Sequence, residues 1–397
     1  MAGPLDGIRV VELGTLIAAP FAGRLFAELG AEVIKVESPD GGDPLRNWRK
    51  IHNGTSLWWY IQARNKKSIA VDLKSAAGQS VVRQLAATAD VVIENFKPGT
   101  LERWGLGWDE LHALNPKLTM VRISGFGQDG PYRDRPGFGA IGEAMGGVRY
   151  TTGMPDGPPV RTGISLGDSL ASLHAALGAL ASLLRVKSGR GQGQVVDVSL
   201  AESVFNLMET LVPEFDLLGH VRTRSGPTLP GIAPSNTYRT QDGVYIVIAG
   251  NSDSIFKRMM IAIGRQDLAD DARFSTNSGR VEHCEFLDAA IGEWVARHLA
   301  SEALQRLEAA EVPSGRIYTA ADIVSDPHYL ARGMILDSRL PDGTPVKIPG
   351  IVPKFSDTPG AVRWLGPKLG EHTRDVLQAL GVSPAEIDRL TAIGAIG

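Results

Sequence analysis

Residues 8–37 read IRVVELGTLIAAPFAGRLFAELGAEVIKVE, and this stretch indicates the fold class. Ile8–Leu13 and Ala31–Glu37 are rich in β-branched side chains, as strands are. Between them, Pro20–Leu29 has apolar side chains at helical spacing and stops at Gly30. A strand, a helix and a second strand joined this closely predict a parallel pair with a right-handed crossover.

The alternation continues beyond this unit. We expect further strands at 68–73, 91–94 and 120–123, and helices over 81–89 and near Leu111. Alternating strands and helices predict an α/β fold with a doubly wound open sheet. After Gly137 the pattern changes to a glycine- and proline-rich stretch at 153–163, an amphipathic helix over 169–187, a strand at 195–200 and a helix over 202–218.

The second half of the chain predicts a smaller α+β domain that ends near Tyr329. A proline-containing connector over 225–237 precedes a strand at 244–249 and helices over 255–263, 286–298 and 301–310. The tail from Met334 contains short strand-like pieces and a last helix over 373–380.

Composition excludes several classes of protein. The 397 residues carry 41 basic and 44 acidic side chains, a net charge of −3, which offers no basic surface for nucleic acid. One cysteine, Cys284, rules out an intramolecular disulfide, and the eight histidines show no metal-ligand spacing, so we expect no metal. The start lacks a signal-peptide pattern, and the apolar stretch 170–184 is too short to span a bilayer. We therefore expect a cytoplasmic protein that does not associate with membranes.

Common cofactor motifs are absent. The turn Gly14–Ala19 lacks the Gly-x-Gly-x-x-Gly pattern of dinucleotide-binding proteins, and no P-loop pattern occurs in the chain. These absences disfavour a dehydrogenase and an ATPase.

One short motif matches a serine hydrolase. Gly163-Ile164-Ser165-Leu166-Gly167 is a Gly-x-Ser-x-Gly sequence, in which Ser165 would be the nucleophile and His372 a possible base. The motif requires a buried strand directly before the serine, and Pro158–Thr162 is a poor core strand. The hydrolase stays open as an alternative.

Asp168 is the stronger nucleophile candidate. It stands directly before the helix expected from Ser169, where an aspartate commonly acts only as an N-cap. The same position keeps a carboxylate ionised, because the helix N-terminus carries positive partial charge. An ionised, fixed carboxylate can attack an activated acyl group, and Gly167 leaves room for a substrate beside it.

Basic residues suggest a phosphate-bearing ligand. They cluster at 46–50 and 64–67, and Lys74, Lys97 and Arg103 follow. Asn95–Gly99 comes directly after an expected strand, at the sheet edge where open α/β sheets bind ligands. Solvated lysines are the common alternative.

The chain resembles the family III CoA-transferases, whose members include formyl-CoA:oxalate and carnitine CoA-transferases. The resemblance extends over nearly the whole length and is carried by Pro4–Val10, Leu29–Glu37, Asn65–Ile69, Glu94–Gly99, Ser124–Tyr132, Gly189–Gln194 and Leu369–Thr373. It implies that Asp168 is the catalytic nucleophile. It also implies a Rossmann-like large domain over 1–200 completed by 330–397, linker helices and a small domain over 201–329, and an interlocked homodimer.

The resemblance implies substrates and contacts as well. The expected substrates are an acyl-CoA thioester and a carboxylic acid, with no permanently bound cofactor. CoA is expected to pass between two acids through a mixed anhydride and an aspartyl-CoA thioester. We expect that Arg46 or another basic group can pair with the second carboxylate of a dicarboxylic acid. The family's CoA contacts fall on Ile17, Ala18, Val71, Asp72, Leu73, Lys74, Asn95, Phe96, Lys97 and Arg103.

Departures from the family pattern argue against some substrates. Formyl-CoA transferase has glutamine, arginine and glutamate where this chain has Ile17, Ser38 and Gly139, so oxalate and formate are disfavoured. The family's glycine-rich loop is reduced to Ala249–Asp253. α-Methylacyl-CoA racemases of the same superfamily carry a His-Asp pair where this chain has Phe138-Gly139, which disfavours proton abstraction. A racemase-like enzyme and a non-catalytic CoA-binding protein remain alternatives.

Overall fold

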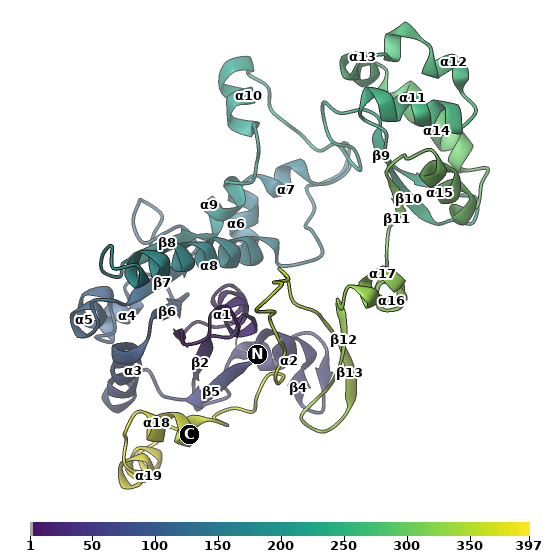
Figure 1. Ribbon diagram of the computed structural model, residues 1–397. Helices are drawn as coiled ribbons and strands as arrows, with labels where there is room; N and C mark the ends of the chain where they lie inside the picture. The colour runs from purple at the N-terminus through teal and green to yellow at the C-terminus, as the bar shows by residue number, and fades with distance from the viewer. Residues whose placement is uncertain (1–2) are drawn as a thin grey trace. The chain divides into compact units, whose positions relative to one another are not determined.

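A six-stranded parallel sheet organises the larger part of the protein. The computed structural model describes residues 3–397 (Figure 1). The strands run in the order β5-β2-β1-β6-β7-β8. Numbered by their order along the chain, they give 3-2-1-4-5-6, the doubly wound arrangement, which confirms the predicted parallel α/β sheet. Their bounds are β1 Arg9–Glu12, β2 Glu32–Glu37, β5 Lys66–Ala70, β6 Val91–Glu94, β7 Thr119–Ser124 and β8 Val195–Ser199.

Helices cover both faces of this sheet because successive strand residues point to opposite sides. Val11 and Val92 pack under α3 (Ala76–Thr88), α5 (Trp108–Leu114), α18 (Thr373–Ala379) and α19 (Pro384–Ala392). Val10 and Val91 pack against the other layer, α1 (Ala18–Glu28) and α8 (Leu166–Lys187). Small residues on α8, such as Ala171 and Ala175, are buried there and let the helices approach closely.

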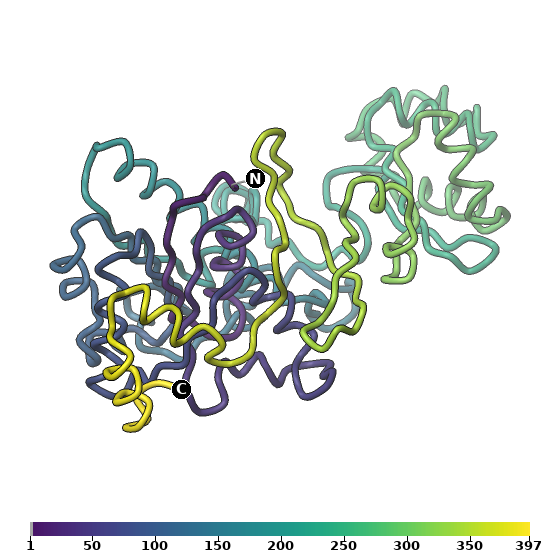
Figure 2. Tube along the Cα trace, turned by 60° about the horizontal axis from the view of Figure 1, so that its bottom comes forward, coloured from purple at the N-terminus to yellow at the C-terminus, as the bar shows by residue number. Residues whose placement is uncertain are grey.

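The C-terminal segment returns to the sheet. Figure 2 shows the yellow end of the chain lying along the purple N-terminal part. The buried guanidinium of Arg64 donates to the carbonyl of Pro349, and the side chain of Asn65 holds the backbone of Ala361 and Arg363. Residues distant in sequence therefore complete one unit, which comprises Met1–Arg149, Thr162–Pro213 and Ala331–Gly397. Its shorter elements are η1 Pro44–Asn47, β3 Ile51–His52, β4 Thr55–Ser56, α2 Leu57–Gln62, α4 Thr100–Arg103, α6 Gly139–Met145, α9 Leu200–Phe205, β12 Ile335–Arg339 and β13 Pro345–Pro349.

The second unit has a core of its own. It comprises Tyr150–Arg161 and Glu214–Leu330, so a segment within the expected 1–200 domain packs with this unit instead. An antiparallel sheet in the order β11-β10-β9 buries Ile246 and Ile248 against helices. Its elements are β9 Ser235–Arg239, β10 Tyr245–Ala249, β11 Ser314–Arg316, α11 Asp253–Ala262, α12 Gln266–Ala269, η2 Ala272–Phe274, α13 Asn277–Glu282, α14 Cys284–Val295, α15 Ala300–Ala309, α16 Ala320–Ser325 and α17 Pro327–Ala331, while α7 Val148–Thr151 and α10 Leu211–Leu218 adjoin the boundaries between the units.

Several local predictions were wrong. Helix α8 begins at Leu166 with Ser165 as its N-cap, so Asp168 lies inside the first turn instead of capping the helix. The helix expected over 202–218 is divided into α9 and α10, because Glu209 between them has a positive φ of 51°. A final helix, α19, was missed although Ser383 caps it by accepting the amide hydrogen of Glu386.

The length predicted for the apolar helix was also wrong. The sequence suggested an apolar stretch too short to span a bilayer, but α8 has 22 residues. Within the described residues it is the one helix long and apolar enough to cross a bilayer. Ala171, Ala175 and Ala179 are buried against the sheet layer whereas Leu173, Leu177 and Leu184 are exposed, which is the arrangement of a helix with one buried face.

Candidate functional site

Two loops meet at the carboxyl edge of the large sheet, between β1 and β6. The side chain of Asn95 donates to the carbonyl of Thr15 over 2.9 Å and accepts the amide hydrogen of Thr15 over 2.8 Å. Residue 14 is glycine because an added Cβ would overlap with Asn95 and Ala19. The strand order reverses between β1 and β6, and open α/β sheets bind ligands in the crevice at such a point.

A cavity of about 140 Å³ lies at this edge. The predicted CoA contacts Val71–Lys74 and Phe96 line it, and Asn95 is tied to another lining residue, Thr15. Phe96 packs edge-on against Trp104, with 5.4 Å between ring centroids, and so forms part of the cavity wall. The other predicted contacts are not among the lining residues: Ile17, Ala18, Lys97 and Arg103.

Asp168 lies beside the start of α1 and the start of α6. The Ser172 hydroxyl is 2.7 Å from the carbonyl oxygens of both Asp168 and Ala18, so it ties the first turn of α8 to α1. An added Cβ at Gly139 would overlap with Oδ2 of Asp168. The half-buried carboxylate thus occupies the space that a side chain at 139 would fill. The structure brings Asp168 and the predicted contact Ala18 together.

A buried glutamate supports the residue before Asp168. Oε1 of Glu143 accepts the amide hydrogen of Gly167 over 3.3 Å, and Oε2 pairs with Arg149 at 3.1 Å. Gly139 and Glu143 are one helical turn apart on α6, so the same face of this helix contacts the first turn of α8 twice. Sequence analysis missed Glu143 because no motif marks it.

Four further charged side chains below the first loop were also missed. Glu12, Lys35, Asp43 and Lys66 are at most 1% exposed. Burial opposes the charge on Lys35, but the neighbouring carboxylates of Asp43 and Glu12 raise its pKa above its usual value. Burial, only partly offset by Glu12, lowers the pKa of Lys66 to about 8. Burial also opposes the charge on Asp43, but the Lys35 ammonium outweighs it and lowers the pKa of Asp43.

Glu94 links the second loop to the sheet. Its Oε2 accepts the amide hydrogen of Phe96 over 2.7 Å, and its Oε1 accepts from Arg122 over 2.8 Å. Burial outweighs the favourable effect of Arg122 and raises the pKa of Glu94 to about 7. The charge that holds Phe96 at the cavity is therefore sensitive to pH near neutrality.

Two arginines of the basic clusters pair with carboxylates of the fold. Arg46 pairs with Glu37 through two bonds of 2.8 Å and stacks on Trp59, so the fold itself uses the guanidinium that was expected to face a second carboxylate. Arg64 is buried against the Glu28 carboxylate. Both guanidinium groups are used to hold the fold.

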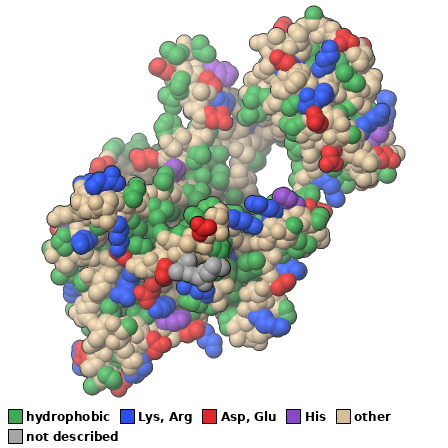
Figure 3. All heavy atoms as spheres, viewed as in Figure 1, with side chains coloured by type: hydrophobic (Ala, Val, Ile, Leu, Met, Phe, Trp, Pro, Cys, Tyr) green, Lys and Arg blue, Asp and Glu red, His purple; other side chains and the backbone are tan. Residues whose placement is uncertain are grey.

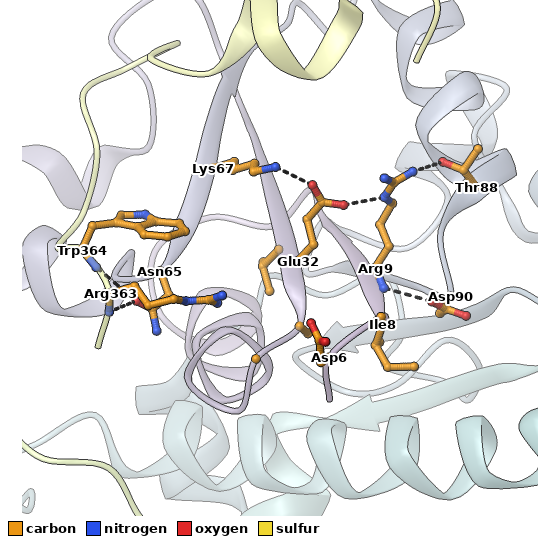
Figure 4. A pocket seen from close by; sticks show the side chains of 14 residues that line it. Asp6, Ile8, Arg9, Glu32, Asn65, Lys67, Thr88, Asp90, Arg363 and Trp364 are labelled. Atoms are coloured by element: carbon orange, nitrogen blue, oxygen red, sulfur yellow. Dashed lines mark hydrogen bonds and ion pairs between the residues drawn. The ribbon is translucent and has the colours of Figure 1, made fainter. Parts of the chain in front are cut away.

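Lys67 lies at the opposite edge of the sheet, in a second cavity of about 370 Å³ (Figure 4). Its ammonium is 2.5 Å from Glu32, whose other oxygen accepts from Arg9 over 2.7 Å. Carboxylates already neutralise these two cations, so the cavity offers no unpaired positive charge from them for a phosphate.

The serine hydrolase arrangement is not supported. Ser165 caps α8, and the preceding residues form no strand. Nδ1 of His372 lies 3.3 Å from the amide of Ser68 on β5, and no histidine hydrogen-bonds to Ser165 in the described part of the chain. Residues 3–397 also contain no cluster of three metal-ligating side chains.

Comparisons with known proteins find similar chains over nearly the whole length. The model of CoA-transferase family III matches residues 5–373. The chain is 52% identical over 391 residues to succinyl-CoA–D-citramalate CoA-transferase of Chloroflexus aurantiacus, covering 98% of this chain and 97% of the relative. It is 41% identical over 392 residues to the β subunit of succinyl-CoA–L-malate CoA-transferase of that organism, covering 98% and 96%. A solved CaiB/BaiF family protein from Brucella suis matches with a TM-score of 0.83 and 36% identity, covering 96% of this chain and 100% of that chain.

Proposed function

The chain belongs to CoA-transferase family III, and we propose that it moves CoA from succinyl-CoA to a small dicarboxylic acid. Citramalate and malate are the first acceptors to test, since two similar relatives are named for them. The observation that carries this proposal is the 52% identity over nearly the full length of a citramalate CoA-transferase. The position of Asp168 beside Ala18 and Gly139 supports the assignment of the nucleophile.

The proposed reaction is a series of acyl exchanges at Asp168. A carboxylate oxygen of Asp168 attacks the thioester carbonyl, the C–S bond breaks, and a mixed anhydride and CoA thiolate form. The thiolate attacks the aspartyl carbonyl, which releases succinate and leaves an aspartyl-CoA thioester. The acceptor carboxylate then displaces CoA to form a second anhydride, and the thiolate attacks the acceptor carbonyl of that anhydride and restores Asp168. Each step exchanges one activated acyl group for another, so the thioester energy is retained.

The local structure suits an ionised Asp168. The first turn of a helix stabilises negative charge, and α8 places its only first-turn acid there. Ser172 holds the backbone of this turn, and Glu143 holds the amide of Gly167. These contacts fix the direction from which the carboxylate attacks, which covalent catalysis requires.

The acceptor is tested by direct product analysis. Purified protein is mixed with succinyl-CoA and, separately, with D-citramalate, L-malate, glutarate or oxalate, and CoA esters are identified by mass spectrometry. We expect rapid formation of the citramalyl or malyl ester and little product from oxalate, because Gly139 stands where formyl-CoA transferase carries a glutamate. Absence of a new CoA ester with every dicarboxylate would overturn the proposal. Incorporation of deuterium at the α-carbon without an acceptor would favour the racemase-like alternative.

We also propose that the active protein is a homodimer of interlocked subunits. Leu173, Leu177 and Leu184 on α8 are 50%, 66% and 64% exposed, and Figure 3 shows hydrophobic side chains in green on the face that carries α8. A row of exposed leucines is characteristic of a surface that another chain covers. Light scattering after size-exclusion chromatography should give twice the 42.4 kDa mass of the chain.

Charge substitutions test the leucine row. Leu177→Glu combined with Leu184→Glu should convert the dimer to monomer or aggregate, because two buried carboxylates would be unpaired. Lys187→Glu, on an exposed position of the same helix, is the matched control and should remain dimeric. A monomeric wild-type protein would contradict the dimer.

A further inference from the structure

The buried charges below the loop that follows β1 form one connected chain. The Lys35 ammonium lies 3.0 Å from Glu12, 2.8 Å from Asp43 and 2.7 Å from the carbonyl oxygen of Gly14. Lys66 lies 2.6 Å from the other oxygen of Glu12 and 2.6 Å from the carbonyl of Pro20. Burying charges is costly, and apolar side chains of similar volume commonly stabilise a fold as well. A general stabilising role therefore does not explain this cluster.

The loop above the cluster has an unusual backbone. Leu16 has a φ of 65°, in the left-handed region that a branched residue rarely adopts. The carboxylate of Asp43 accepts the amide hydrogen of Leu16, with oxygens at 3.1 and 3.2 Å. The Lys35 ammonium donates to the carbonyl of Gly14. The side chain of Asn95 bonds to both the amide and the carbonyl of Thr15. Strained backbone persists where its surroundings over-determine it, and such positions concentrate at functional sites.

The clamped loop adjoins the candidate site on two sides. Thr15, Lys35 and Asp43 line the cavity of about 140 Å³ at the carboxyl edge of the sheet. The chain then enters α1 at Ala18. The hydroxyl of Ser172 bonds to the carbonyl oxygens of both Ala18 and Asp168 and so links the two residues. A change in the conformation of Leu16 would therefore alter the cavity wall, while Ser172 separately holds Ala18 against the first turn of α8.

We propose that Asp43, supported by Lys35, is a positioning residue that holds Leu16 in the left-handed conformation required for acyl-CoA binding. This inference rests on the proposed function and adds to it a role for Asp43 and Leu16, which lie outside the family motifs quoted above, whereas Lys35 lies within one of them. The Asp43 carboxylate accepts the amide hydrogens of Leu16 and Leu45 and pairs with Lys35, and we assign its effect on the cavity to the bond with Leu16. Its removal should therefore affect CoA affinity more than the intrinsic reactivity of Asp168.

The first test is Asp43→Asn, which keeps the size of the side chain and removes the charge that faces Lys35. We expect the Kd for coenzyme A, measured by isothermal titration, and the KM for succinyl-CoA to rise at least tenfold, with less than a threefold change in kcat at saturation. Asp40→Asn is the matched control, because Asp40 is an exposed acid on the same loop. A lower melting temperature with unchanged Kd and KM would mean that the cluster only stabilises the fold.

A second substitution tests the link to Leu16. Glycine adopts a positive φ without strain, so the loss caused by Asp43→Asn should be several-fold smaller in a Leu16→Gly background. Equal losses in both backgrounds would overturn the proposal. If Asp43→Asn does not fold, the double variant Lys35→Met, Asp43→Asn replaces it. This variant removes a cation and an anion together, so neither is left buried without the other. The Kd of the double variant for coenzyme A should still rise at least tenfold. An inactive wild-type protein would contradict the proposed function. An active wild-type protein whose Asp43 variants keep the wild-type Kd and KM would contradict only this inference.

Discussion

Asp168→Asn is expected to lower the rate of CoA transfer by about 10³-fold or more, since removal of a covalent nucleophile commonly costs this much. The amide has nearly the shape of the carboxylate, so α8 should retain its contacts with Ser172 and Gly139. The measurement is the initial rate of CoA ester formation from succinyl-CoA, together with the mass of the intact protein after brief mixing with succinyl-CoA. Wild type should show a CoA adduct on the peptide that contains Asp168, and the variant should show none.

Asp168→Ala and Ser165→Ala make this test decisive. Alanine cannot be converted to aspartate by deamidation, so Asp168→Ala should lose at least as much activity as the asparagine variant. Ser165 caps α8 without a side-chain hydrogen bond to the helix, so Ser165→Ala should keep activity within a few-fold of wild type. Transfer at the wild-type rate by Asp168→Ala would remove the aspartate from the mechanism. Loss of activity in Ser165→Ala alone would restore the hydrolase interpretation.

The second large effect is expected at a residue that has no side chain. Gly139→Ala places a Cβ on Oδ2 of Asp168, so the carboxylate must rotate away from its position. Misplacement of a reacting group by about 1 Å can cost about 10²-fold in rate, and we expect kcat to fall by roughly that factor. The KM for succinyl-CoA should change little, because the cavity at β1 and β6 lies on other residues.

Stability separates this effect from misfolding. Gly139 is the first residue of α6, where alanine favours the helix, so the melting temperature should stay constant or rise. Gly163→Ala is the matched control, because its Cβ would meet nothing within 4 Å. A Gly139→Ala enzyme with wild-type kcat would show that Asp168 does not need the position seen here. Equal losses in both variants would point to a general intolerance of added side chains.

Much of the fold could be predicted from local patterns. The β-rich segments, the helical spacing of apolar residues and the glycines that end helices lie within short windows, so β1, α1, β2 and the alternation after them were recognised. The order of strands along the chain then restricts the topology, because right-handed crossovers leave few arrangements. Asp168 was singled out as a candidate from its place near the start of a long helix, and its role as nucleophile stays a prediction.

Other features depend on contacts between residues far apart in sequence. Arg46 and Lys66 looked like ligands for phosphate, but they pair with Glu37 and Glu12 once the strands lie side by side. Gly139 and Asp168 are separated by a long connection, and only the packing of α6 on α8 reveals that one leaves space for the other. The charge of a side chain is local information, whereas its partner and its burial are properties of the folded chain. Local pattern therefore indicated the doubly wound sheet and a candidate nucleophile, because both are written in short stretches of sequence. Tertiary packing decided which charges are paired within the fold and which hold the loop that follows β1, because those pairings join residues far apart in the chain.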